Sequence, residues 1–331
     1  MNKNPILRWG LLSTARINRA VIPPIRNSKH SQLLAVASRD QKSAVEFAQT
    51  WQIPRMHSSY EDILADPEID VIYNPLPNSM HAEWSIKAVH AGKHVLCEKP
   101  LANSLAEVDA MRVAAEQTGK IITEAFMYRH HPQTLQVKEL INSGVIGKIQ
   151  LIRGSFTYVA ARPNDVRLDP RLGGGCLWDV GCYPISYARM LVGSELEEVF
   201  GWQILSPQGV DIHFVGQLRF PGEIYTQIQS SFITPHAPFM EIIGSQGTLL
   251  IPKPFVPGKH EKVILRKGDQ DQVIRSRGAD LYQGEITDIE NSILQGTSPR
   301  VSLIDSRNNT AAILALLESA RTGLPIHPAT L

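Results

Sequence analysis

The sequence predicts an α/β protein of two domains, a parallel sheet with crossover helices followed by an α+β domain with a large, mostly antiparallel sheet. A length of 331 residues is enough for two hydrophobic cores. Over the first 125 residues, short apolar runs alternate with helical patterns, as they do where helices connect parallel strands. Beyond that point, strand-like segments follow one another at Pro-Gly and Ser-Gln-Gly turns. We therefore place the domains at residues 1–125 and 126–331.

The first domain is expected to contain five strands, each followed along the chain by a helix or a loop. The strands are predicted over residues 7–12, 33–38, 71–74, 94–97 and 121–125, and three helices over 42–51, 82–91 and 105–117. Ser104 and Glu107 form a capping-box pattern at the start of the last of these helices. A further helix should follow the first strand and break or kink at Pro23-Pro24, because proline lacks the N–H that a helix interior needs.

The second domain begins with a helical pattern and then becomes rich in strands. We expect a helix over 135–142, a strand over 149–158, a loop to Gly175 and a helix that carries Asp179 and Tyr183. Several strands should lie between 196 and 265, including 212–220 and 224–233, and two helices, 284–294 and 302–322, should close the chain.

The composition is that of an ordinary globular protein. A formal charge of +1 and a hydrophobic fraction of 43% give no basic excess for nucleic acid and no charged tail. No apolar run reaches the ~18 residues that a membrane span needs, and no export signal pattern precedes the first strand. Cys97, Cys176 and Cys182 lack disulfide or metal-ligand spacing, so we expect reduced thiols, no metal and a cytoplasmic location.

Two short motifs place a lysine, a carboxylate and a tyrosine in this setting. Glu98-Lys99-Pro100 follows a strand, and Gly173-Gly174-Gly175 precedes Asp179 and Tyr183. An ammonium near a phenol favours the phenolate, which suits proton transfer to or from a hydroxyl or carbonyl. The four-residue spacing puts Asp179 and Tyr183 on one face of a helix. From the residues alone, Tyr183 as a core aromatic and Asp179 as a helix cap remain open alternatives.

Together these motifs resemble the Gfo/Idh/MocA oxidoreductases along nearly the whole chain. The tyrosine stands where the usual family pattern has histidine, as in the branch with dihydrodiol dehydrogenase, glucose-fructose oxidoreductase and NADP-dependent xylose dehydrogenase. The resemblance implies a Rossmann-type first domain that binds a nicotinamide cofactor, and a second domain that binds substrate and mediates oligomerisation. It also implies Tyr183 as general acid/base, Lys99 as the group that stabilises its phenolate, and Asp179 as a residue that orients the substrate or Lys99.

The turn after the first strand is a degenerate dinucleotide-binding fingerprint. Ser13, Ala15 and Asn18 occupy its three glycine positions, and Ala15 still permits a close approach of the pyrophosphate to the helix N-terminus. At the end of the second strand, Arg39 suits a 2′-phosphate and therefore NADP, whereas Asp40 leaves NAD open.

Residues expected to contact the cofactor come from this turn and the second strand. The resemblance adds the stiff Pro-rich loop after residue 74 and the Glu-Lys-Pro motif. They are Ser13, Thr14, Ala15, Arg16, Ile17, Ser38, Arg39, Asn74, Pro75, Leu76, Asn78, His81, Glu98 and Lys99. The family pattern around residues 124–132 and the Arg-rich loop before Gly173 imply a substrate pocket lined by Met127, Arg129, Arg167, Trp178 and Tyr282. His130 and His131 are more often structural than catalytic in such a pair before proline.

The leading hypothesis is an NADP-dependent oxidoreductase that acts on a sugar or polyol, for example an aldose oxidised to its lactone. The alternatives are a ketoreductase of a nucleotide-linked keto sugar and a reductase of small dicarbonyl or dihydrodiol compounds. A nucleotide would need basic or aromatic partners in the loop 159–172. A non-enzymatic cofactor sensor would have no use for Lys99 together with Tyr183. The second domain should leave one face of its sheet exposed. The resemblance implies pairing through that face, and therefore a homodimer or a dimer of dimers.

Overall fold

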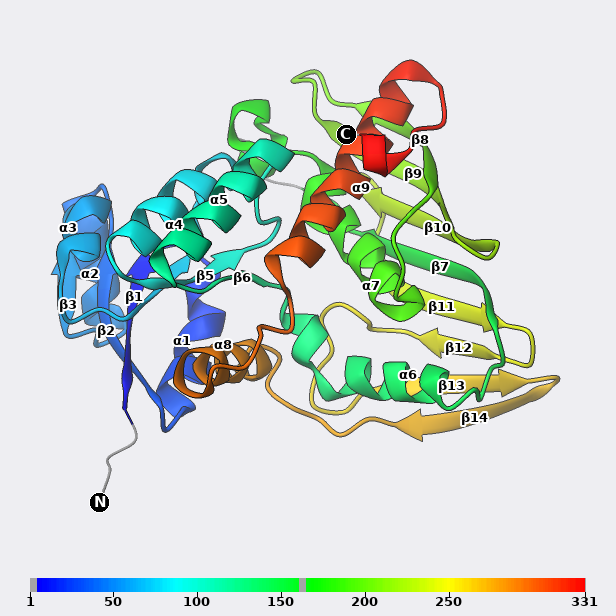
Figure 1. Cartoon of the computed structure of the whole chain (residues 1–331), viewed down its shortest axis with the longest axis horizontal. Coiled ribbons are helices and arrows are strands. Elements are labelled where there is room, and N and C mark those ends of the chain that lie inside the picture. The colour runs from blue at the N-terminus through cyan, green and yellow to red at the C-terminus, as the bar shows by residue number, and fades with distance from the viewer. Residues whose placement is uncertain (1–4, 161–164, 331) are drawn as a thin grey trace. The chain divides into compact units, whose positions relative to one another are not determined.

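The computed structural model describes residues 5–160 and 165–330, and the chain forms two compact units. The first unit comprises Met1–Met127 and Tyr282–Ser306, and the second comprises Tyr128–Leu281 and Arg307–Leu331. The division expected from sequence put all residues after 125 in the second domain, whereas residues 282–306 belong to the first compact unit. Helix α8 (Gln283–Gln295) packs Ile286 and Ile289 into the core of the first unit, beside α1 (Figure 1). Local sequence patterns do not reveal such a return, because it depends on contacts between distant segments.

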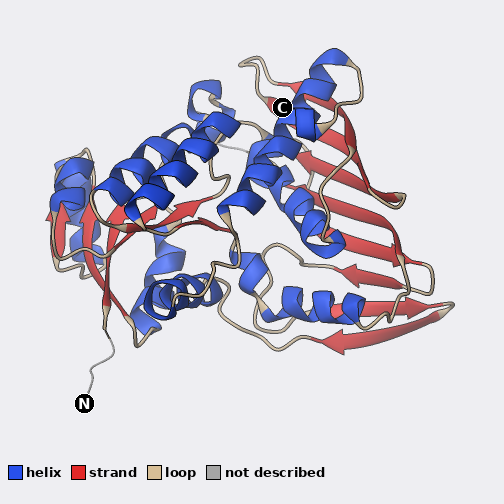
Figure 2. Cartoon of the chain, in the orientation of Figure 1, coloured by secondary structure: helices blue, strands red, loops and turns tan. Residues whose placement is uncertain are grey.

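The first unit contains a parallel sheet of six strands in the order β3-β2-β1-β4-β5-β6. Strands are drawn in red and helices in blue in Figure 2. The strands are β1 (Leu7–Leu12), β2 (Ser31–Ala37), β3 (Arg55–His57), β4 (Val71–Asn74), β5 (His94–Glu98) and β6 (Ile122–Ala125). The connecting helices are α1 (Asn18–Asn27), α2 (Gln41–Thr50), α3 (Tyr60–Ala65), α4 (His81–His90) and α5 (Leu105–Thr118). The predicted Rossmann-type sheet is thus confirmed. Strand β3 has only three residues and was not predicted from the sequence.

Helix α1 continues through Pro23 and Pro24, so the chain does not break there, and the kink that we gave as the other outcome stays a prediction. Each proline removes one hydrogen bond from the helix interior. Pro23 is exposed, so solvent can satisfy the carbonyl group left on that side, while Pro24 is buried with Val21, Ile22 and Ile25. Apolar packing on one face therefore holds the helix together where its hydrogen-bond ladder is incomplete.

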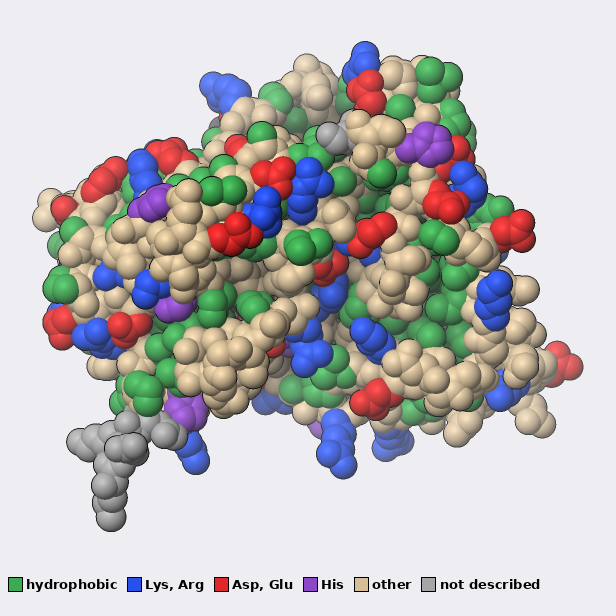
Figure 3. All heavy atoms as spheres, in the orientation of Figure 1, with side chains coloured by type: hydrophobic (Ala, Val, Ile, Leu, Met, Phe, Trp, Pro, Cys, Tyr) green, Lys and Arg blue, Asp and Glu red, His purple; other side chains and the backbone are tan. Residues whose placement is uncertain are grey.

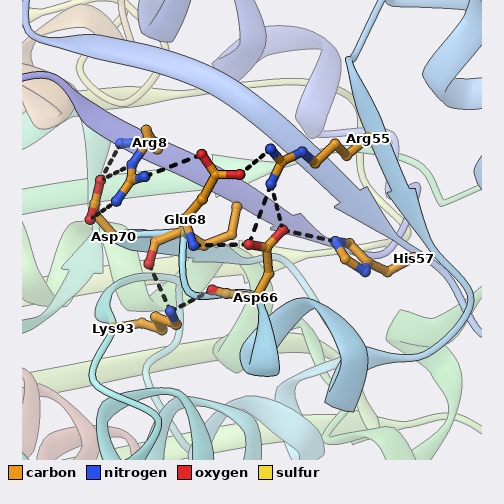
Figure 4. A network of polar contacts seen from close by, with 8 residues as sticks. Arg8, Arg55, His57, Asp66, Glu68, Asp70 and Lys93 are labelled. Carbon is orange, nitrogen blue, oxygen red and sulfur yellow. Dashed lines mark hydrogen bonds and ion pairs between the residues drawn. The ribbon is translucent and has the colours of Figure 1, made fainter.

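The amino ends of the parallel strands are tied together by a network of charged side chains (Figure 4). Asp70 accepts two hydrogen bonds from the Arg8 guanidinium and one from the Arg8 backbone, at 2.8 to 3.0 Å. Arg55 pairs with Asp66 and Glu68, and Lys93 donates to the carbonyl oxygens of Asp66 and Ile69. The arginine and acidic side chains at the amino edge of the sheet are thus paired with one another. In sheets of this kind, ligands bind at the opposite, carboxyl edge.

The second unit contains a sheet of eight strands in the order β14-β13-β12-β11-β7-β10-β9-β8. The strands are β7 (Ile149–Thr157), β8 (Glu198–Leu205), β9 (Asp211–Phe220), β10 (Ile224–Ser231), β11 (Phe239–Gly244), β12 (Thr248–Ile251), β13 (Lys262–Lys267) and β14 (Gln270–Arg275). Neighbours are antiparallel except β7 and β10, which are parallel. The predicted large, mostly antiparallel sheet is confirmed. It extends to β14, beyond the expected limit at residue 265.

Helices cover one face of this sheet. They are α6 (Pro132–Asn142), α7 (Cys182–Val192) and α9 (Leu303–Thr322). A row of cross-strand partners that includes Gly154, Gly216 and Gly201 lies beneath α7 and α9. A Cβ at Gly154 would lie 2.7 Å from Pro184 of α7, and one at Gly216 would lie 2.9 Å from Leu316 of α9. Small residues in this row let the two helices approach the sheet closely.

The other face of the sheet carries large apolar side chains that are open to solvent. Trp202, Ile204 and Tyr225 are each about half exposed, and the ring of Trp202 packs edge-on against Phe200, two residues before it. We call this surface the outer face. Elsewhere, positive and negative side chains are interspersed on the side of the molecule displayed in Figure 3. Among the described residues, no helix is both long and apolar enough to cross a membrane.

Candidate cofactor and substrate sites

The turn between β1 and α1 is held by side chains where the fingerprint would have glycines. Ser13 has a φ of 70°, in the left-handed region that favours glycine. Its hydroxyl accepts the Ala15 N–H at 3.2 Å, and the buried Asn18 side chain donates to the Ser13 carbonyl oxygen at 2.8 Å. The turn thus keeps the tight geometry of the fingerprint and brings the N-terminus of α1 to the carboxyl edge of the sheet. That arrangement fits a pyrophosphate group.

Arg39 and Asp40, which follow β2, make different contacts. Asp40 is the N-cap of α2, and its carboxylate accepts the Ser43 N–H at 2.6 Å. The hydrogen bond from the Ser43 hydroxyl group, followed by the one from the Ser43 N–H, holds the pKa of Asp40 below its usual value. Arg39 is exposed and hydrogen-bonds the hydroxyl group of the buried Tyr60. The acidic side chain is therefore occupied by the helix, while the guanidinium lies at the surface beside Ser38.

The loop after β4 is supported by two buried polar side chains. Asn74 donates to the His81 carbonyl oxygen at 3.2 Å and to the Ser85 hydroxyl at 3.1 Å. The ring nitrogens of His81 lie 2.7 Å from the Leu76 carbonyl oxygen and 2.8 Å from that of Pro100. His81 thereby connects this loop to the Glu-Lys-Pro turn. Both side chains hold the loop that follows β4, and Leu76 of this loop packs into the core of the first unit.

The Glu-Lys-Pro turn begins at the last residue of β5. Glu98 accepts hydrogen bonds from the Tyr73 hydroxyl and from the Lys99 backbone N–H. Burial, followed by the charge of Glu98, raises the pKa of Tyr73. The carboxyl group of Glu285, on α8, is also buried nearby and contributes to this shift. Sequence reasoning missed both Tyr73 and Glu285, because neither belongs to a recognisable motif.

In the second unit, Tyr183 lies in the first turn of α7 within an aromatic cluster. Its ring is 5.3 to 5.6 Å from those of Phe156, Tyr128 and Phe255, and its side chain is 4% exposed. An apolar environment of this kind disfavours a phenolate unless a cation is supplied. Trp178 and Arg129 are also buried in this unit, and Arg129 donates to the Ser186 hydroxyl at 3.0 Å. Met127 and Tyr282 belong to the first unit.

Asp179 lies in a π-helical turn, Leu177–Gly181, just before α7. Its carboxylate accepts the Tyr158 hydroxyl at 2.7 Å and the Arg167 Nε–H at 3.0 Å. We expected one regular helix face to carry Asp179 and Tyr183. Asp179 lies in the π-helical turn and Tyr183 in the first turn of α7, and the two side chains have different surroundings. Their shared face stays a prediction. Tyr158 was not identified from sequence.

The basic residues of the described part of the loop before Gly173 are paired with carboxylates. Arg167 contacts Asp165 at 3.2 Å in addition to Asp179, and these charges raise its pKa. Arg171 pairs with Asp169 at 2.7 Å. Arg162 lies outside the described residues. In the segment from Asp165 to Leu172, carboxylates therefore neutralise the positive charges of both arginines.

Gly175, the last residue of the glycine-rich motif, leaves room for the buried carboxyl group of Asp211. Gly175 has a φ of 128°, and a Cβ there would lie 2.2 Å from Asp211 Oδ1. Asp211 accepts the Leu177 N–H at 2.7 Å and the Cys176 thiol at 3.0 Å, and burial raises its pKa. Asp211 thus caps the π-helical turn that carries Asp179. All three cysteines are free and buried, as expected.

Comparisons with known proteins agree with the fold and extend over both units. A family model described as an oxidoreductase family with an NAD-binding Rossmann fold matches residues 7–126, and the GFO/IDH/MocA C-terminal domain matches residues 134–250. An uncharacterised oxidoreductase of Rhizobium meliloti is 35% identical over 96% of this chain and 98% of its own. The D-xylose 1-dehydrogenase (NADP(+)) 2 of Haloferax volcanii is 34% identical over 97% and 99%.

A solved structure also superposes along nearly the entire chain. It is a 3-ketoreductase from Actinomadura kijaniata in complex with NADP and TDP-benzene. Its TM-score is 0.90 at 29% sequence identity, and the match covers 96% of this chain and 98% of that one.

Proposed function

Because this chain belongs to the Gfo/Idh/MocA oxidoreductase family, we propose that it transfers a hydride between NADP and a sugar or polyol. The concrete reaction is the oxidation of a free aldose at its first carbon to the lactone. The observation that carries this proposal is the 34% identity, over 97% of the chain, to a protein named as an NADP-dependent xylose dehydrogenase. The first unit would bind the cofactor, and the second would bind the substrate.

The proposal for NADP is supported by the geometry at the end of β2. Arg39 is exposed and can form two parallel hydrogen bonds with a 2′-phosphate, to which Ser38 adds a hydroxyl group. Asp40, which would favour the ribose of NAD, is engaged as a helix cap. The turn at Ser13, Thr14, Ala15, Arg16 and Ile17 would hold the pyrophosphate. Bound NADP would supply the hydride acceptor.

We assign to Tyr183 the transfer of the proton to or from the substrate oxygen. In the oxidative direction its phenolate would take the proton of the substrate hydroxyl group, and in the reductive direction its phenol would give the proton to a carbonyl oxygen. The aromatic cluster raises the cost of the phenolate, so we assign Lys99 to stabilise it with its positive charge. Asp179, held by Tyr158 and Arg167, is assigned to orient the substrate. Met127, Arg129, Arg167, Trp178 and Tyr282 remain the proposed pocket residues.

The loop before Gly173 favours an uncharged substrate over a nucleotide-linked one. A diphosphate needs cationic partners, and both Arg167 and Arg171 already face carboxylates. The likeness to a 3-ketoreductase solved with a TDP ligand keeps a nucleotide-linked keto sugar as the second candidate.

The decisive experiment is a substrate panel followed by the absorbance of the reduced nicotinamide. Free aldoses and polyols are offered with NADP or NAD, and a nucleotide-linked keto sugar is offered with NADPH. Turnover of a free aldose with NADP supports the proposal. Turnover of the nucleotide-linked compound alone would establish the second candidate. Cofactor binding without any turnover would point to a sensor and overturn both.

The proposal also covers the oligomeric state and the cellular location of the protein. The outer face of the large sheet exposes aromatic and aliphatic side chains, which suits a two-fold contact with a second copy. We therefore expect a homodimer, with a dimer of dimers as the next step. Three buried free thiols suit a reducing compartment, and we assign the protein to the cytoplasm.

A further inference from the structure

Glu285 is a buried carboxyl group without a hydrogen-bond partner among the described residues. Its side chain is 1% exposed, and neither carboxyl oxygen is satisfied. It lies in the first turn of α8, next to Ile286, which is fully buried in the core of the first unit. An unsatisfied buried carboxyl group is costly, so a folded protein normally retains one for a ligand or a reaction.

The neighbours of Glu285 determine which form of the carboxyl group is present. Burial raises its pKa first, and the charge of Glu98 raises it further. Tyr73 and Tyr282 are the other titratable groups in this cluster. Glu98 accepts hydrogen bonds from the Tyr73 hydroxyl and the Lys99 N–H, which stabilise its ionised form. When two carboxyl groups raise each other's pKa, the state of lowest free energy has the proton on the group that accepts no hydrogen bonds. Glu285 is therefore the protonated member.

The position of Glu285 relative to the sheet indicates what it could bind. Tyr73 is the next-to-last residue of β4, and Glu98 is the last residue of β5, so the cluster lies at the carboxyl ends of these strands. In a doubly wound sheet, dinucleotides bind across the strand ends on both sides of the first strand. The adenosine side here is β2, where Arg39 lies. The strands β4 and β5 form the other half and would receive the nicotinamide.

We propose that Glu285 binds the carboxamide group of the nicotinamide through two parallel hydrogen bonds. A protonated carboxyl group has one donor and one acceptor in the arrangement that matches a primary amide. Its O–H would donate to the amide carbonyl oxygen, and its carbonyl oxygen would accept an amide N–H. This inference rests on the proposed function, because it requires a nicotinamide cofactor. Glu285 would then fix which face of the ring is presented for hydride transfer.

The same helix offers a matched control. Glu290 is 3% exposed, and its carboxylate accepts the Ser31 hydroxyl, which in turn accepts the Trp9 indole N–H at 2.7 Å. Glu290 is thus a buried acid with a structural partner. Replacing Glu290 should lower thermal stability without any effect that depends on the nicotinamide ring.

The test compares two ligands on Glu285→Leu, Glu285→Gln and Glu290→Gln by calorimetric titration. The ligands are NADP and 2′-phospho-ADP-ribose, which keeps the adenosine and pyrophosphate groups but lacks the nicotinamide. Loss of two neutral hydrogen bonds should weaken NADP binding to Glu285→Leu by about 10- to 100-fold. Binding of 2′-phospho-ADP-ribose should stay within about twofold. Glu285→Gln should retain most of the NADP affinity, because an amide also pairs with an amide through two hydrogen bonds.

The outcomes separate this inference from its premise. If Glu285→Leu weakens both ligands equally, or neither, Glu285 does not contact the nicotinamide and the inference is overturned. A fall in the melting temperature of Glu285→Leu with unchanged ligand discrimination would show a purely structural role and overturn it as well. If wild-type protein binds neither ligand, the proposed function itself fails.

Discussion

The Asp40 carboxylate accepts the Ser43 backbone N–H at 2.6 Å, one residue after the Arg39 guanidinium that lies exposed at the end of β2. The sequence Arg-Asp offers one group suited to each cofactor, so the order of residues leaves the choice open. The helix cap engages Oδ1 of Asp40 at the start of α2, which supports our assignment of the 2′-phosphate to Arg39.

Replacing Arg39 with alanine should reverse the cofactor preference. Loss of charge-assisted hydrogen bonds to the 2′-phosphate should weaken NADP binding by about 10- to 100-fold and leave NAD within about threefold. Titration calorimetry with both cofactors measures this. Asp40→Asn is the control, since asparagine caps a helix as well as aspartate does and should preserve the preference for NADP. A change of preference in Asp40→Asn, with none in Arg39→Ala, would assign recognition of the ribose to Asp40.

Replacing Tyr183 with phenylalanine should abolish most of the turnover and keep cofactor binding. Only the hydroxyl group is lost, and the ring can still pack against Phe156 and Phe255. Removal of a general acid/base should lower kcat by ~10²- to 10⁴-fold. Tyr187→Phe is a matched control, because Tyr187 lies one turn further along α7 and stacks on Tyr128. It should stay within about threefold of wild type. Retention of more than a third of turnover in Tyr183→Phe would rule out its role as proton carrier.

His94 should make the first unit less stable as the pH falls from 7 to 4. Its Nδ1 accepts the Ile121 N–H at 3.1 Å, which requires the neutral ring. Burial, followed by the charge of Lys120, lowers the pKa of His94 to about 4. The unfolded chain protonates near pH 6.5, so the stabilisation is fully present above that pH and is lost as the pH falls toward the folded value.

Thermal melts from pH 7 to pH 4.5 test this effect. The melting temperature of wild type should fall over the interval, and His94→Gln should show a smaller fall, because glutamine does not titrate there. Asp66 and Asp70 lose their contribution only at lower pH. Although burial opposes it, hydrogen bonds and charged neighbours hold the pKa of each below its usual value. Identical pH profiles for the two proteins would exclude His94 as the titrating group.

A charge on the outer face should disrupt self-association. Trp202 is 54% exposed beside Phe200, and burying a glutamate there against a second copy would leave it without a partner. Light scattering should give a dimer or larger assembly for wild type and a monomer for Trp202→Glu. Val113→Glu, an exposed apolar position on α5 of the first unit, should leave the assembly unchanged. A wild-type monomer at micromolar concentration would refute the dimer.

Sequence patterns predicted the two sheets well, because their strands are marked by apolar runs and turns. They could not place α8, since its apolar stripe fits either domain until Ile286 is seen against the strands of the first. They predicted a break or a kink at Pro23-Pro24, and α1 has no break because apolar packing around Pro24 compensates for the missing hydrogen bonds.

The motif residues were easier to find than their partners. Lys99 and Tyr183 belong to recognisable strings, whereas Tyr158 and Glu285 are single residues in unremarkable surroundings. The π-helical turn that carries Asp179 has no local signature and depends on a cap from Asp211, which lies in another strand. Side chains recruited across long separations need the fold before they can be identified.

The late return of α8 to the first unit has a consequence for biosynthesis. A ribosome releases the six parallel strands early, yet Ile286 and Ile289 emerge only after all eight strands of the second sheet. During that interval, the surface that these residues will cover stays open, and the nascent first unit must persist as an incomplete core. A fragment that ends at residue 125 would be held at this stage. The first unit can therefore complete its core only after the chain has been synthesised through α8.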